Sequence, residues 1–129
     1  MSSRILIVED EQIIAADLED KLVRMGHEVV GMAIAGDEAV GMADQVKPDL
    51  VLMDIQIEGR MSGTEAAQKI RERTGASIVY VTAFPSVFLR ETAEKPDPGI
   101  CLGKPFSRVQ LEAAVGAALG NRGITRKLE

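Results

Sequence analysis

The stretch Ile5-Leu6-Ile7-Val8-Glu9-Asp10 decides the fold, because four aliphatic residues lead directly into two acids. The stretch Leu50-Val51-Leu52-Met53-Asp54 repeats this arrangement, and Ile78 to Val81 form a third short apolar run. Continuous apolar runs of this length are typical of strands buried on both faces, as in a parallel sheet covered by helices. The sequence therefore predicts a parallel sheet with acids at the carboxyl ends of two strands.

Segments with helical periodicity separate the apolar runs, so that five strand-helix repeats follow one another. Right-handed crossovers between parallel strands then predict an α/β fold, a doubly wound, flavodoxin-like (βα)5 domain with helices on both faces of an open sheet. Handedness does not fix the strand order, and we adopt the order 2-1-3-4-5. In that order the first and third strands are neighbours. The strands are expected at residues 5–8, 29–35, 49–54, 77–82 and 99–102, and the helices at 11–25, 36–47, 63–73, 86–94 and between Ser107 and Gly120.

The 129 residues fit one domain, expected over residues 3–120, followed by a flexible tail at 121–129 whose last two residues could be a cloning remnant. With 20 acidic and 15 basic residues, the net charge of -5 argues against a nucleic-acid surface. Apolar segments are too short to span a membrane. Cys101 is the one cysteine, so no internal disulfide can form, and a reducing cytoplasm is the expected location.

The carboxyl ends of parallel strands meet at one edge of a sheet, so Glu9, Asp10 and Asp54 are expected to lie together. Thr82 and Lys104 also follow strands and are expected at this edge. Three carboxylates brought close together repel one another unless a cation lies among them. Oxygen ligands with room for water suit Mg²⁺, with Asp10 and Asp54 as direct ligands. Helix capping is an equally good explanation for Glu9 alone, but it does not explain the lysine.

These residues also carry a family resemblance that covers about residues 3 to 120. The chain resembles a response-regulator receiver domain of two-component signalling, of the stand-alone, single-domain type. Each motif is short, but their order and spacing together are specific. The motifs are Ile5-Leu6-Ile7-Val8-Glu9-Asp10-Glu11, Pro48-Asp49-Leu50-Val51-Leu52-Met53-Asp54, Val81-Thr82-Ala83 and Lys104-Pro105-Phe106.

The resemblance implies a role for each site residue. Asp54 would be the phosphoacceptor, and Thr82 and Lys104 would bind the phosphoryl oxygens. Asp10, Glu9 and the backbone carbonyl of Gln56 would join Asp54 in holding Mg²⁺. The reaction would be phosphoryl transfer from a sensor histidine kinase or a histidine phosphotransfer protein, followed by slow self-dephosphorylation. The protein would then be a switch rather than a turnover enzyme.

The resemblance also implies how the signal leaves the domain. No output domain is visible in the sequence, so a downstream protein target is expected, and a homodimer is left open. The docking surface would run from about Ser86 to Leu119, with Phe88, Leu89 and Ile100 as candidate contacts. Core packing is the default explanation for any one of these three residues. Motor control, phosphorelay transfer and drainage of phosphate from a kinase all remain open.

Two positions depart from the family pattern. The family places an aromatic switch residue three positions before the lysine, where this chain has Cys101. Cys101 is expected to be a small core residue rather than a redox sensor. Phe84 is the candidate that would carry the signal instead, although a loop aromatic that only covers the start of the fourth helix is the more ordinary explanation. The loop after Asp54 lacks the Met-Pro pair common in the family, and Gly63 arrives about one residue late.

Three other function classes share parts of this pattern. A flavodoxin-like cofactor binder would need glycines and hydroxyls where Glu9-Asp10-Glu11 stand, since acids repel a phosphate. An aspartate-dependent phosphatase would place its nucleophile after the first strand and would usually need a cap domain. A pseudo-receiver that binds partners without accepting phosphate is the alternative that remains, and the intact acidic set argues against it.

Overall fold

The computed structural model describes residues 2–93 and 97–128, with side chains placed up to residue 120. Five parallel strands form one sheet in the order β2-β1-β3-β4-β5, as the sequence predicted. β1 and β3 pair directly, with Ile5 beside Leu50 and Val8 beside Met53. The strands are β1 (Arg4–Val8), β2 (Glu28–Ala33), β3 (Leu50–Asp54), β4 (Ser77–Thr82) and β5 (Ile100–Gly103).

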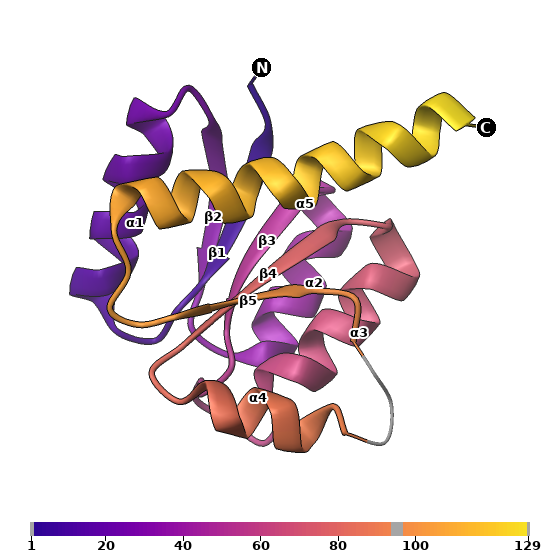
Figure 1. Cartoon of the computed structure of the whole chain (residues 1–129). Helices are drawn as coiled ribbons and strands as arrows, with labels where there is room; N and C mark the ends of the chain where they lie inside the picture. Colours follow the sequence, from indigo (N-terminus) through magenta and orange to yellow (C-terminus); the bar gives the residue numbers. More distant parts are fainter. Residues whose placement is uncertain (1, 94–96, 129) are drawn as a thin grey trace.

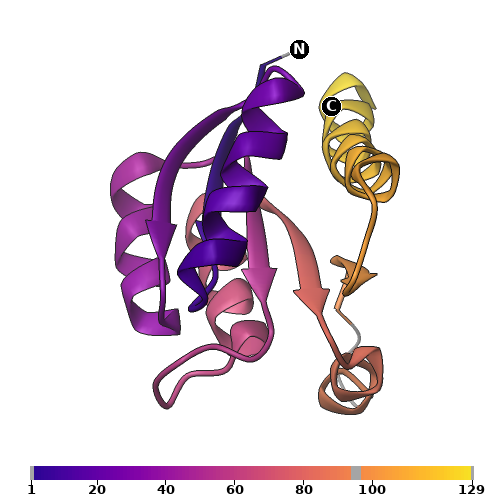
Figure 2. The ribbon, with the colours of Figure 1, turned by 90° about the vertical axis from the view of Figure 1, so that its left-hand side faces the viewer.

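Helices cover both faces of the sheet (Figures 1 and 2). α1 and α5 lie on one face, and α2 and α3 lie on the other, while short α4 packs near β5 at the edge. In Figure 2 the arrowheads of β2, β3 and β4 point to the lower side, so the carboxyl ends of these strands share that edge. The helices are α1 (Gln12–Arg24), α2 (Gly36–Val46), α3 (Gly63–Thr74), α4 (Pro85–Glu91) and α5 (Arg108–Leu128).

The central strands are buried on both faces, which explains why they read as unbroken apolar runs. Residues 5–8 and 50–53 have no exposed surface. Alternate side chains point to opposite faces of a strand. Leu6 and Val8 therefore join the core under α2 and α3, whereas Ile5 and Ile7 join the core under α1 and α5. This two-sided packing fixes the register of β1 against β3, and thus the position of the acids that follow.

Most element boundaries lie within two residues of prediction, but the end of the last helix was predicted wrongly. Ser107 caps α5 as expected, since its hydroxyl accepts a hydrogen bond from the Gln110 N–H at 3.1 Å. Gly120 does not end α5, which continues to Leu128. A glycine ends a helix by adopting positive φ, and Gly120 is not among the glycines that do so. Whether residues 121–129 form a tail apart from the receiver stays a prediction.

The segment between α4 and β5 was expected to be a turn or loop. Asp97 to Gly99 form no helix or strand, as expected, while Lys95 and Pro96 lie outside the described residues. α4 ends at Glu91, three residues before the predicted end. In the described part of the chain, no helix combines the length and apolar character that a membrane span requires.

Candidate functional site

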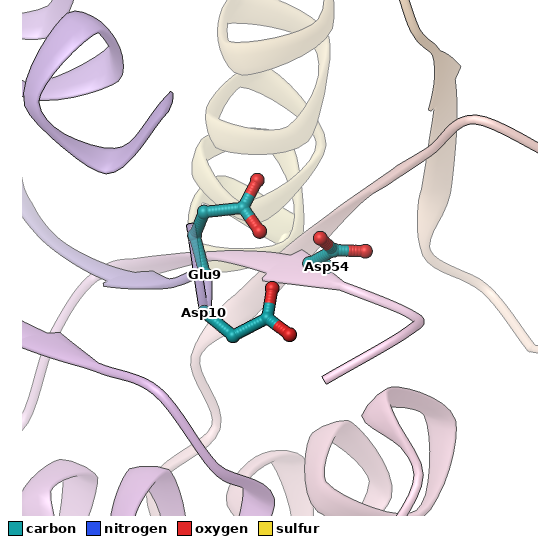
Figure 3. Close-up of side chains that lie close together, drawn as sticks. All are labelled: Glu9, Asp10 and Asp54. Atoms are coloured by element: carbon teal, nitrogen blue, oxygen red, sulfur yellow. The ribbon is translucent and has the colours of Figure 1, made fainter. Parts of the chain in front are cut away.

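The two strands at the centre of the sheet deliver three carboxyl groups to one place. Glu9 and Asp10 directly follow β1, and Asp54 is the last residue of β3. One carboxylate oxygen from each lies within 4.8 Å of the others. Figure 3 shows the three groups gathered where β1 and β3 end. The direct pairing of β1 with β3 therefore produces the cluster that the sequence predicted.

Lys104 supplies a positive charge to this cluster from the loop after β5. Its ammonium donates hydrogen bonds to Glu9 Oε1 at 2.7 Å and to Asp54 Oδ2 at 3.1 Å. The backbone N–H of Lys104 also donates to the Thr82 carbonyl oxygen at 2.7 Å, which ties this loop to the end of β4. The lysine side chain is 18% exposed, so water screens its charge only weakly. One lysine thus links the ends of three neighbouring strands.

Glu9 shows that the cluster carries more negative charge than Lys104 can balance. The pKa of the Glu9 carboxyl is raised from 4.5 to about 8, chiefly by burial and in addition by nearby Asp54, while Lys104 opposes the shift. Glu9 Oε2 is buried and, among the residues that the structure describes, is the one buried side-chain polar atom without a hydrogen-bond partner. A buried acceptor without a partner is costly. A proton on Glu9 or a divalent cation beside it would complete the charge balance.

These observations fit the oxygen-rich site that Mg²⁺ prefers. The donor set is carboxylate only, without the His or Cys ligands that other metals favour. Asp10 is half-buried, which leaves room for water in the coordination shell of Mg²⁺. Glu9 Oε2 is an acceptor that a cation could engage. The residues present therefore suit a magnesium ion.

Asp54 is held in a rigid frame, 5% exposed. The Gln56 N–H donates to Asp54 Oδ1 at 3.0 Å, so the Gln56 peptide lies beside the carboxylate, while the Gln56 side chain points to solvent. Gly63, the first residue of α3, lies against the backbone of Asp54, and a Cβ there would collide with the Asp54 carbonyl oxygen. Gly63 is thus a positioning residue. Its shifted place is evident in the sequence, whereas this contact is not.

The unusual loop between β3 and α3 has defined contacts. Glu58 forms a parallel bridge with Ala35, and Met61 packs so close to Gly36 that an added Cβ would meet Met61 Cβ at 3.0 Å. Ser62 then caps α3, accepting a hydrogen bond from the Glu65 N–H at 3.2 Å. The loop is therefore held against the start of α2.

Thr82 ends β4 at the same edge of the sheet. It is fully buried, and its hydroxyl accepts a hydrogen bond from the Phe84 N–H at 3.0 Å. Its backbone bond to Lys104 places it next to the cluster, although its hydroxyl is turned toward the start of α4 rather than bonded to Asp54. The structure thus brings Glu9, Asp10, Asp54 and Lys104 into one group, with Thr82 and Gln56 at its border.

The expected docking contacts behave differently from one another. Leu89 is 67% exposed, as a contact residue requires, but Phe88 is only 8% exposed and belongs to the core. Ile100 is half-buried and packs against the core under α5. Cys101 is also half-buried beside the other core, and burial raises the pKa of its thiol, which agrees with a packing role. For Phe88 the default expectation of core packing holds, because its ring packs against Tyr80.

This geometry has a counterpart in known proteins. The model of the response regulator receiver domain family matches residues 5–116 of the chain. The chain belongs to this family. Its members are typically signalling switches rather than turnover enzymes, and the acidic pocket of this receiver domain is typical of phosphoacceptor sites.

Relatives of this receiver domain include longer regulators. The whole chain is 37% identical over 130 residues to the phyllosphere-induced regulator PhyR of Methylorubrum extorquens, and covers 48% of that protein. It superposes on the crystal structure of the response regulator PhyR from Brucella abortus with a TM-score of 0.88 and 36% identity, over 98% of this chain and 51% of that one. The receiver domain thus spans about half the length of these relatives.

A further structure bears on the metal. The receiver domain of the sensor histidine kinase PA1611 from Pseudomonas aeruginosa PAO1 was solved with a magnesium ion coordinated in its active-site cleft. This receiver domain shares 28% identity with it and superposes with a TM-score of 0.80, over 93% of this chain and 99% of that one. A homologous receiver therefore binds Mg²⁺ in its active-site cleft.

Proposed function

We propose that this chain is a phosphoacceptor switch whose Asp54 takes a phosphoryl group in a Mg²⁺-dependent reaction. The donor would be a phosphohistidine on a sensor histidine kinase or a histidine phosphotransfer protein. One observation carries the proposal: Asp54 shares Lys104 with Glu9, beside Asp10, at the meeting point of β1 and β3. This group combines a nucleophile, a fixed cation and spare oxygen ligands.

The residues proposed to hold Mg²⁺ are the carboxylates of Glu9, Asp10 and Asp54 and the backbone carbonyl of Gln56. The buried, unpartnered Glu9 Oε2 supports this assignment, as does the Gln56 peptide lying beside Asp54. When bound, the ion would neutralise charge on the transferred group and orient its oxygens. Glu9 would have to release its proton, since only the carboxylate binds a hard cation well.

In the proposed reaction an Asp54 carboxylate oxygen attacks phosphorus in line with the leaving imidazole nitrogen. The new P–O bond forms as the P–N bond breaks, and the electron pair of that bond returns to the imidazole ring. Lys104, already 3.1 Å from Asp54 Oδ2, offsets negative charge on the phosphoryl oxygens. The Thr82 hydroxyl turns from Phe84 to donate a hydrogen bond to a phosphoryl oxygen.

Hydrolysis of the acyl phosphate returns Asp54 to its starting state, so the chain modifies itself rather than turning over a small substrate. The proposed setting is the cytoplasm, with a kinase or phosphotransfer protein upstream and a protein target downstream. Leu89 on α4 supports output through a protein contact, because its side chain is 67% exposed.

Mass spectrometry after incubation with Mg²⁺ and acetyl phosphate tests this function. The wild type should gain one acid-labile phosphoryl group, which EDTA prevents and which Asp54→Asn cannot take up. Asp49→Asn, which changes an acid at the other end of β3, is the matched control and should still be modified. A wild type that stays unmodified with both acetyl phosphate and a cognate kinase would favour the pseudo-receiver alternative.

A further inference from the structure

A second buried carboxylate lies away from the acidic cluster and joins three parts of the chain. The Asp97 side chain has no exposed surface. Its Oδ1 accepts hydrogen bonds from Arg71 on α3 at 2.8 Å and from the Gly99 N–H at 2.7 Å. Its Oδ2 accepts a hydrogen bond from the Tyr80 hydroxyl on β4 at 2.6 Å. Both oxygens are thus engaged, and the segment before β5 is anchored to α3 and β4.

Tyr80 is the member of this network that lies on the same strand as Thr82. It stands two residues before Thr82 on β4, and the strand pleat places both side chains on the same face. Burial raises the pKa of the Tyr80 hydroxyl, and its hydrogen bond to Asp97 raises it further, so it remains a donor at neutral pH. Tyr80 also lies directly beside Cys101 in the pairing of β4 with β5.

The Tyr80 ring contacts the elements on either side of the Asp97 segment. Its centroid lies 4.9 Å from that of Phe88 on α4, and the two rings are tilted by 47°. A Cβ at Gly99 would lie 2.5 Å from Tyr80 Cε2, so the chain before β5 presses against the ring. Tyr80 on β4 therefore packs against the chain that leads into β5. This contact does not require a large side chain at Cys101 on β5.

β4 thus touches α4 at two places. Thr82 accepts a hydrogen bond from Phe84, the residue that precedes α4, and Tyr80 packs against Phe88 within it. If Thr82 turns toward a phosphoryl group, its bond to Phe84 is the first to change. The Tyr80 side chain is not free to rotate when Thr82 and Phe84 move, because a charge-assisted hydrogen bond to the buried Asp97 carboxylate fixes its hydroxyl.

We propose that Tyr80, held by Asp97 and Arg71, is the positioning residue that transmits loading of Asp54 to α4 and β5. Tyr80 would thus act as the aromatic switch residue, which in the family stands at the position of Cys101. This inference rests on the proposed function and names how that site is read out. The contacts expected to change on phosphorylation are then the buried ones that Tyr80 makes with Phe88 and Gly99, rather than those of an exposed ring.

The chain provides its own probe for this idea. Tyr80 is the single tyrosine, and there is no tryptophan in the 129 residues, so tyrosine absorbance and fluorescence report this one hydroxyl. Mg²⁺ with beryllium fluoride serves as the acyl-phosphate mimic. It should change the Tyr80 emission of the wild type, and Asp54→Asn should not respond. Asp97→Asn should change the starting emission and lose the response, while acetyl phosphate still modifies Asp54.

Two further variants separate signalling from folding. Arg71→Gln weakens the network, whereas Arg73→Gln on the same helix removes an exposed ion pair with Asp44 and is the matched control. Tyr80→Phe keeps the ring and removes only the hydroxyl, so it should fold. In Tyr80→Phe and Arg71→Gln, the mimic should no longer alter amide exchange across residues 85–91. In Arg73→Gln it should still do so.

The outcomes distinguish this inference from the function on which it rests. The inference alone would be overturned if Asp54 is modified and amide exchange in α4 changes, but Tyr80 emission stays constant. An exchange response that survives in Tyr80→Phe would overturn it as well. If mass spectrometry shows that Asp54 is never modified, the proposed function fails, and the inference fails with it.

Discussion

Two buried sites in the described part of the chain, Asp97 and the acidic cluster, differ in how completely their charges are matched. Asp97 has a hydrogen bond to each oxygen and an ion pair with Arg71. The acidic cluster contains three carboxylates, but its one lysine pairs with only two of them, Glu9 and Asp54, and Glu9 Oε2 has no partner. The first arrangement is expected to stabilise the fold, whereas the second leaves a cost that a ligand can remove.

The degree to which charges are matched distinguishes a structural site from a functional one, even when both contain the same residue types. Both groups contain buried acids beside a cation, and both lie where chain segments far apart in sequence meet. Only the acidic cluster has an unsatisfied acceptor and a carboxyl whose pKa rises to about 8. Perturbed carboxyls of this kind gather at functional sites. The following changes test the contrast, beginning with the largest expected effect.

Asp97→Ala should cause the largest loss of stability. It leaves Arg71 and the Tyr80 hydroxyl without their acceptor, so the free energy of unfolding should fall by about 3 kcal/mol. Urea denaturation at pH 7 would measure the loss. The control is Asp44→Ala, whose ion pair with Arg73 is exposed and should contribute less than about 1 kcal/mol. Equal losses for the two variants would contradict a special role for the buried network.

Lys104→Met should destabilise the metal-free chain by less, about 2 kcal/mol, because Glu9 can take up a proton when the lysine is gone. Thermal melts with and without Mg²⁺ would show that the ion restores part of the loss. Arg24→Met removes an exposed ion pair with Asp20 and should show no such Mg²⁺ dependence. A Lys104→Met chain as stable as the wild type would mean that the lysine does not offset the acids.

Glu9 should make the stability of the metal-free chain depend on pH. Its pKa rises from 4.5 to about 8 on folding, so the folded chain binds more protons than the unfolded chain between these values. Stability from this group is therefore present at low pH and is lost as pH rises toward 8. Urea midpoints across this window should fall in the wild type and fall less in Glu9→Gln. The affinity for Mg²⁺ should rise over the same window, because the ion competes with the proton.

Asp10→Ala should have the smallest effect on the metal-free fold. Asp10 is half-buried, and removing one of three crowded acids relieves repulsion, so the melting temperature should stay unchanged or rise slightly. The increase that Mg²⁺ produces in the wild type should be lost. Glu11→Ala, which changes an exposed acid outside the cluster, should keep that increase. An unchanged Mg²⁺ effect in Asp10→Ala would refute Asp10 as a ligand.

The acidic cluster could be located from the sequence because its signals are local. Strands buried on both faces read as apolar runs, and the polar residue that follows each run marks the end of the strand. Glu9, Asp54 and Thr82 could be placed at the edge of the sheet in this way. The Asp97 network gave no such signal. Asp97 stands in a proline-rich loop, where an exposed acid is the normal expectation, and Tyr80 stands among aliphatic residues of a buried strand.

The sequence by itself determined which strands lie at the centre of the sheet and which residues stand at their ends. The reason is that a strand buried on both faces is recognised from the apolar character of consecutive residues. Only the tertiary structure decided which charges are matched. Lys104 reaches Glu9 across 95 residues of chain, and Arg71 reaches Asp97 across 26. A hydrogen bond forms only when donor and acceptor lie within a few tenths of an ångström of the preferred separation, and that separation depends on how whole helices pack. The unpartnered oxygen of Glu9 and the satisfied carboxylate of Asp97 are consequences of that packing.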